Sequence, residues 1–111
     1  MTNKMKEYIV NELENSKIED IVSIDTSKTS SMADLVIIGS GRSGKQIESA
    51  MENLKVQMKE DNVYDGGMIS GVANDGWIIY DLGNIIVHLF VPAVRDIYKL
   101  EDLYILKNKK K

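Results

Sequence analysis

The chain has 111 residues, of which 43% are hydrophobic and 28% charged, with a single proline and no cysteine. This length and balance predict one folded domain, and the lack of cysteine excludes disulfide bonds and thiolate metal sites. Charged residues interrupt the N-terminal segment, so we expect neither a secretion signal nor a membrane span, and we predict a soluble, cytoplasmic protein.

The formal net charge of −3 is unevenly distributed along the chain. Four of the fourteen cationic side chains lie within residues 107–111, which leaves ten cations against seventeen acids elsewhere, a net charge of −7. An acidic body repels nucleic-acid backbones and attracts a basic protein partner. We therefore predict one domain over residues 1–106 and a disordered lysine tail over 107–111, for which a contact with RNA is the alternative.

The first half of the chain alternates between helical and strand patterns. Apolar residues that recur every three or four positions predict two amphipathic helices, over residues 3–15 and around 47–58. Short apolar runs at 21–24 and 35–38 predict strands, and the second run is typical of an interior strand covered on both faces. Strand, turn and helix together form the first half of a βαβ unit, so we expect a crossover to another strand.

The second half of the chain predicts a β-hairpin. A short strand is expected at 68–72, followed by strands at 77–82 and 85–91 that are joined by Gly83-Asn84, a pair typical of a two-residue type II′ turn. Counting outward from this turn assigns alternate residues to opposite faces of the sheet. The core face contains Ile78, Tyr80, Leu82, Ile85, Val87 and Leu89. The other face contains Trp77, Ile79, Asp81, Ile86, His88 and Phe90. One or two short helices are expected after Pro92.

The segment from Gly39 to Gln46 matches two phosphate-binding patterns. Its glycines spell G-x-G-x-x-G, and Gly44-Lys45 completes most of G-x-x-x-x-G-K-[ST], but Gln46 replaces the hydroxyl that would bind magnesium. The alternative is a helix cap in which Ser43 accepts from the Gln46 amide and the Gln46 side chain reaches back to the Ser43 amide. We favour the cap, because it requires no ligand and single motif matches are often accidental.

His88 is the only histidine in the chain. Asp81 lies diagonally across the hairpin from it, so a catalytic pair of base and orienting acid is conceivable. A nucleophile beside them is not evident, and the chain lacks the second histidine, cysteine or acid cluster that a metal site or triad would use. We therefore favour a packed or surface-recognition histidine over a catalytic one.

Taken in order, several short blocks of this chain resemble the Iojap-like ribosomal silencing factor family over residues 21–104. The first half contributes Asp20-Ile21-Val22, Asp25, Ala33-Asp34, Gly41, Ser43 and Gln46. The second half contributes Trp77, Tyr80-Asp81-Leu82-Gly83, Val87-His88-Leu89-Phe90, Arg95, Tyr98, Leu100-Glu101 and Leu103. Gly39 and Lys45 stand where the family tends to have Ala and Arg, so the apparent phosphate loop is partly particular to this chain.

The resemblance implies an α/β (α+β) domain with a mixed five-stranded sheet flanked by helices, related to the nucleotidyltransferase fold but without its catalytic acids. It implies no enzyme activity, no cofactor and no metal. Members of the family bind ribosomal protein L-fourteen on the large subunit and block subunit association, which represses translation. The lysine tail would then offer a minor contact with ribosomal RNA, and a homodimer of the free protein is compatible with this function.

The resemblance and the residue types together predict a partner-binding site that consists of Trp77, Tyr80, Asp81, Leu82, Gly83 and His88. Aromatic rings and a carboxylate suit a basic partner. The alternation of the hairpin places Tyr80 on the core face, so its inclusion rests on the resemblance. The alternative function is a small nucleotide-binding or nucleotidyltransferase-type enzyme that uses the loop Gly39–Lys45.

Overall fold

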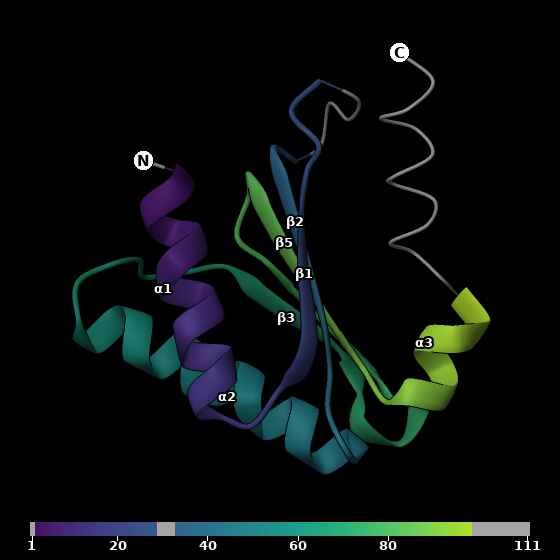
Figure 1. Ribbon diagram of the computed structural model, residues 1–111. Coiled ribbons are helices and arrows are strands. Elements are labelled where there is room, and N and C mark those ends of the chain that lie inside the picture. Colours follow the sequence, from purple (N-terminus) through teal and green to yellow (C-terminus); the bar gives the residue numbers. More distant parts are fainter. Residues whose placement is uncertain (1, 29–32, 99–111) are drawn as a thin grey trace.

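The computed structural model describes residues 2–28 and 33–98 (Figure 1). In chain order the elements are α1 (Thr2–Asn15), β1 (Glu19–Asp25), β2 (Leu35–Ser40), α2 (Gly44–Glu60), β3 (Met68–Val72), the short 3-10 helix η1 (Ala73–Asp75), β4 (Trp77–Asp81), β5 (Ile85–Phe90) and α3 (Pro92–Tyr98). All the elements predicted up to residue 98 are present at nearly the predicted bounds. The predicted lysine tail and any second terminal helix lie outside the described residues.

The strands form one mixed sheet in the order β1-β2-β5-β4-β3. β2 and β5 are parallel, and the other neighbouring pairs are antiparallel. The chain leaves β2 through α2, enters the sheet again at the far edge as β3, and returns through the β4–β5 hairpin to the place beside β2. The predicted crossover from β2 through α2 therefore leads to β3, which runs parallel to β2 but lies at the far edge of the sheet. The expected mixed sheet with flanking helices is confirmed.

α1 and α2 pack against one face of this sheet and form the main core (Figure 1). The helical spacing in α2 aligns its apolar residues along the side that meets the strands. Burial of one aliphatic side chain stabilises a fold by about 1.5–3 kcal/mol, so this layer supplies most of the driving force. Side chains that the core buries almost completely are Ile9, Leu13, Ile37, Ile47, Met51, Leu54, Met58, Ile78, Tyr80 and Ile85.

A second, smaller apolar cluster lies on the opposite face of the sheet. Its buried members are Ile24, Val36, Ile38 and Phe90, and Val22, Trp77 and Val94 pack against it. Every residue of β2 is buried, because β2 contributes alternate side chains to both clusters. The prediction of an interior strand covered on both faces is confirmed.

The register of the β4–β5 hairpin agrees with the count made from its turn. Ile78 pairs with Leu89, and Tyr80 pairs with Val87. The Leu82 amide donates to the Ile85 carbonyl at 2.8 Å, and Gly83 has a φ of +96°, which a residue with a side chain adopts only at a steric cost. The turn thus places the side chains of the hairpin on their predicted faces.

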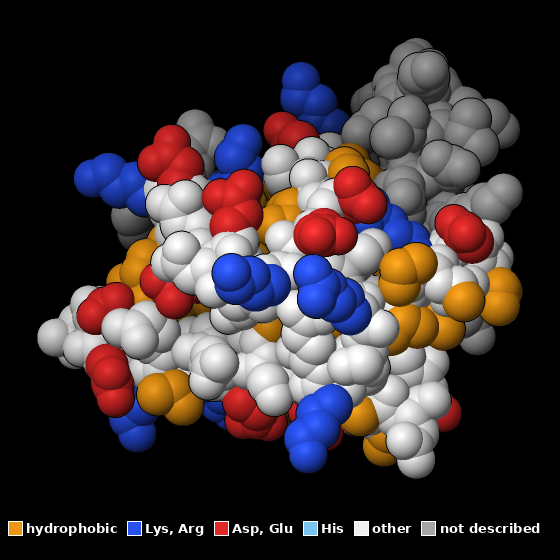
Figure 2. Space-filling view, turned by 60° about the horizontal axis from the view of Figure 1, so that its bottom comes forward, with side chains coloured by type: hydrophobic (Ala, Val, Ile, Leu, Met, Phe, Trp, Pro, Cys, Tyr) orange, Lys and Arg blue, Asp and Glu red, His pale blue; other side chains and the backbone are white. Residues whose placement is uncertain are grey.

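Figure 2 shows the end of the molecule where α2 begins, with acidic and basic side chains interspersed over much of the surface. Hydrophobic side chains gather on the side where α3 lies, and Ile97 of that helix is 73% exposed. Within the part of the chain that the structure describes, no helix is both long enough and apolar enough to cross a lipid bilayer.

Candidate functional site

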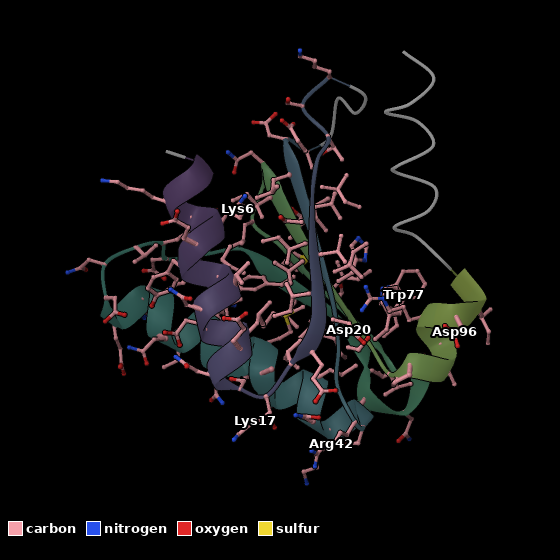
Figure 3. All side chains as sticks on the ribbon, viewed as in Figure 1. Lys6, Lys17, Asp20, Arg42, Trp77 and Asp96 are labelled. Atoms are coloured by element: carbon pink, nitrogen blue, oxygen red, sulfur yellow. The ribbon has the colours of Figure 1, made fainter. Side chains whose placement is uncertain are left out.

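Three rings, those of Trp77, His88 and Phe90, form a group on the face of the sheet opposite to α1 and α2. Trp77 lies directly across the hairpin from Phe90, with ring centroids 4.9 Å apart. The rings of His88 and Phe90 are nearly parallel, at 6.1 Å and 6°. Figure 3 shows Trp77 between the sheet and α3. Phe90 is fully buried and His88 is 7% exposed, whereas Trp77 is half-buried, so the indole is the part of this group that reaches the surface.

Trp77 and His88 are also joined by a hydrogen bond. The indole Nε1–H donates to Nδ1 of His88 at 3.1 Å. Because an indole nitrogen can only donate, Nδ1 must be unprotonated and the neutral imidazole carries its proton on Nε2. Burial lowers the pKa of His88 from 6.5 to about 4, which keeps the ring neutral at neutral pH.

Exposed apolar side chains from the neighbouring strand extend this face. Met68 and Val72 of β3 pair with Asp81 and Trp77 of β4, so their side chains lie on the same side of the sheet as the indole. Met68 is 70% exposed and Val72 is 54% exposed, so two large apolar side chains reach the surface beside the indole. Together with half-buried neighbours they form an apolar surface, interrupted by the exposed Ser70, which we call the Trp77 face. Its members are Met68, Val72, Trp77, Ile79 and Ile86.

The sequence-based site prediction did not include Met68 and Val72. A signal was available, because Met68, Ser70 and Val72 alternate in a short strand, but only the pairing of β3 with β4 shows that they lie beside Trp77. β3 and β4 are joined by the 3-10 helix η1 and Gly76 and not by a two-residue hairpin turn, so no turn type fixed their register in advance.

Asp81 and Gly83 lie at the exposed turn next to the Trp77 face. The Asp81 carboxylate accepts a hydrogen bond from the Gly83 amide at 2.8 Å, which holds the acid at the start of the turn. His88 uses its Nδ1 for Trp77 and Asp81 uses its Oδ1 for Gly83. The two residues therefore serve as separate structural partners in this conformation, and their bonds give no support to a catalytic pair of base and orienting acid.

Tyr80 and Leu82, two of the predicted partner-binding residues, lie in the core of the free protein. Tyr80 is 1% exposed and Leu82 is 3% exposed, because the alternation of the hairpin directs both toward α1 and α2. The Tyr80 hydroxyl donates to the Gly66 carbonyl at 2.8 Å, and burial raises the pKa of this phenol to about 12. Neither side chain is available to a partner in this conformation.

The glycine-rich loop forms a helix cap, as favoured from the sequence. The Ser43 hydroxyl accepts from the Gln46 amide at 3.1 Å at the start of α2. The second half of the predicted capping box is wrong in detail, because Gln46 Oε1 accepts from the Arg42 amide at 2.5 Å and not from that of Ser43. The NH₂ group of Gln46 points to the Ser16 carbonyl just after α1, at 3.3 Å, which turns its oxygen toward Arg42.

The same contacts occupy groups that a phosphate cradle would use. The Gly41 amide donates to the Phe90 carbonyl at 2.9 Å, and the Arg42 amide is held by Gln46. A side chain on Gly44 would overlap the carbonyl of Ala73, so this glycine allows α2 to approach η1. Basic side chains at this end, among them Arg42 and Lys17, point outward and lie among acids (Figures 2 and 3). The loop geometry therefore favours a structural role over nucleotide binding.

Arg95 fixes α3 beside the Trp77 face. Its guanidinium donates to the Ser40 hydroxyl at 2.7 Å and to the Asp20 carbonyl at 2.8 Å, and the residue is only 9% exposed. Ser40 is the last residue of β2, and its hydroxyl serves as an anchor for α3. Among residues 2–28 and 33–98, no three His, Asp or Glu side chains are placed to hold a metal ion.

Comparison with known proteins identifies the family. A family model described as "Ribosomal silencing factor during starvation" matches residues 2–111. The chain is 33% identical over 101 residues to the ribosomal silencing factor RsfS of Chromobacterium violaceum, a match that covers 91% of this chain and 82% of that protein. It is 32% identical over 91 residues to the RsfS protein of Bacillus subtilis, covering 82% and 76%.

A solved structure agrees with these matches. A crystal structure of a protein from Chromobacterium violaceum superimposes with a TM-score of 0.85 at 30% identity, and the match covers 94% of this chain and 86% of that one. The family expected from the ordered sequence blocks is thereby confirmed, and the chain belongs to the ribosomal silencing factor family.

Proposed function

We propose that this protein binds the large ribosomal subunit through ribosomal protein L-fourteen and sterically blocks association of the two subunits in the cytoplasm, repressing translation. The observation that carries the proposal is the Trp77 face, an exposed apolar surface next to the carboxylate of Asp81. Large apolar side chains exposed together on a small domain typically mark a surface that another protein covers. The contact requires no chemistry, which agrees with a non-enzymatic role.

The net negative charge of the domain supports the proposal that its partner is basic. The sequence has a pI of about 5.1, and the acidic residues outside the lysine tail exceed the basic ones by seven. Such a body is attracted to a basic ribosomal protein, and Asp81 at the edge of the apolar surface is placed to pair with a Lys or Arg. The proposed contact residues are Met68, Val72, Trp77, Asp81 and Gly83, while Tyr80 and Leu82 support the hairpin from below and His88 supports the indole.

Two valines provide a matched test of this surface. Val72 is 54% exposed on the Trp77 face, and Val56 is 53% exposed on α2, on the opposite side of the sheet. We expect Val72→Glu to weaken co-sedimentation with large subunits at least tenfold, because the charge would have to be buried at the contact. Val56→Glu adds the same charge at the same exposure and should leave binding unchanged. Equal effects of the two variants would rule out the Trp77 face as the contact.

A subunit-joining assay tests the function itself. Light scattering of mixed small and large subunits should show joining suppressed by excess protein and restored with Val72→Glu or Asp81→Lys. Lys45→Ala, in the glycine-rich loop, should suppress joining as the unaltered protein does. Joining that continues in excess protein would refute the proposed function, and a thermal shift with millimolar nucleotide would favour the enzymatic alternative.

Two further contacts that we propose for this protein each have their own test. Sedimentation of the isolated protein measures whether it forms a homodimer when free. Removal of residues 107–111 measures whether the lysine tail contributes to ribosome binding, and a contribution from RNA contacts would decrease as salt rises.

A further inference from the structure

His88 lies beneath Trp77 and cannot serve as an ordinary contact residue. It is 7% exposed, pairs with Ile79 across the hairpin, and stacks on Phe90. A partner that covers the Trp77 face would touch the indole before it reached the imidazole. Any effect of His88 on docking must therefore act through Trp77.

The hydrogen bond between these residues determines how the indole is held. The tilted contact with Phe90 does not by itself select one orientation of the indole, whereas a bond from Nε1–H to a fixed acceptor does. The acceptor is itself held by the stack of His88 on Phe90. Preorganisation of a half-buried aromatic residue lowers the entropy cost of docking.

We propose that His88 is a positioning residue, which holds the Trp77 indole in its docking orientation through the unprotonated Nδ1. The role in docking rests on the proposed function, but the hydrogen bond exists in the free protein. Because Nδ1 is an acceptor only in the neutral ring, protonation of His88 would remove the bond and place two donors against each other.

Charged groups near His88 already have other partners. On β4 the titratable residue of this face is Asp81, whose Oδ1 accepts from Gly83. On α3 the titratable residues are Asp96, which is exposed, and Arg95, which is buried and donates to Ser40 and Asp20. The residues that β2 and β3 direct to this face are apolar or hydroxyl-bearing, so among described residues the neutral form of His88 is favoured by burial alone.

The indole signal tests the hydrogen bond directly, because the chain has one tryptophan. In ¹H–¹⁵N spectra of the free protein at pH 7, we expect the single indole N–H peak to move upfield and to exchange faster in His88→Leu. His88→Asn, which offers an acceptor near the position of Nδ1, should restore most of the shift. In the unaltered protein the peak should also move as the pH falls toward 4, and His88→Asn should lack this titration.

A double-mutant cycle tests the role in docking. His88→Leu should weaken binding to large subunits about tenfold in the unaltered protein and less than twofold in the Trp77→Phe background, which has no indole N–H. Equal losses in both backgrounds, or an unchanged indole peak in folded His88→Leu, would overturn the proposal. If the unaltered protein fails to bind large subunits, the proposed function is wrong. The change of the indole N–H peak in His88→Leu then still tests whether His88 positions the indole of Trp77.

Discussion

Replacement of Gly44 by alanine sets two physical effects against each other. Gly44 is the first residue of α2, and alanine is the better helix former by up to about 1 kcal/mol in a helix interior. Propensity alone therefore predicts that Gly44→Ala stabilises the protein. The structure predicts the opposite, because the added Cβ would overlap the Ala73 carbonyl of η1.

The relative sizes of these two effects determine whether Gly44→Ala stabilises or destabilises the protein. Overpacking a well-packed site costs about 1–3 kcal/mol, and the upper part of this range applies where the neighbour is backbone that no side-chain rotation can move away. The propensity gain is smaller at the first turn than in a helix interior. We therefore expect Gly44→Ala to lower the free energy of unfolding by about 1–2 kcal/mol, or roughly 4–8 °C in melting temperature.

Urea denaturation followed by far-UV circular dichroism measures this difference. Ser49→Ala, at an exposed position of the same helix, isolates the propensity effect and should be neutral or slightly stabilising. If Gly44→Ala is as stable as the unaltered protein, the close approach of α2 and η1 does not constrain this glycine. The explanation of Gly44 as a packing residue would then fail.

Three further predictions concern stability. Burial lowers the pKa of His88 to about 4 in the folded protein, against 6.5 in the unfolded chain. The free energy of unfolding is therefore highest above pH 6.5 and falls by about 3 kcal/mol in total as the pH decreases toward 4. Urea titrations at different pH should show a smaller decrease for His88→Asn. Tyr80→Phe leaves the Gly66 carbonyl without its donor and should cost about 1 kcal/mol in urea unfolding. Ser43→Ala removes the cap of α2 and should cost about 1 kcal/mol, whereas an unchanged melting temperature would argue against that cap.

Local patterns predicted the secondary structure because each reflects a nearby physical cause. The apolar spacing in α2, the continuous apolar run in β2 and the Gly83-Asn84 turn each depend on residues close in the chain. The hairpin register followed from the turn, because a two-residue loop leaves one way to pair its flanking strands. The same count placed Tyr80 on the core face, and the structure confirms that Tyr80 is 1% exposed there.

The capping loop marks the limit of such local rules. Ser43 caps α2 as its position predicts, but Gln46 bonds to Arg42 and to the end of α1, thirty residues away in the chain. The sequence around Ser43 cannot predict this contact, because the contact depends on where the end of α1 lies in the folded protein. The glycine motif likewise resembles a phosphate loop in sequence. Only the structure shows that η1 approaches Gly44 too closely for a side chain at that position.

By itself the sequence determined the domain class, the family, the order of helices and strands, and the two faces of the hairpin, because these depend on periodicity, turn chemistry and ordered local blocks. Only the tertiary structure decided which residues meet across the sheet. It placed Met68 and Val72 beside Trp77 and buried His88 beneath the indole. The pairing of β3 with β4 and the burial of His88 depend on contacts between whole elements, which the local preferences of these residues do not determine.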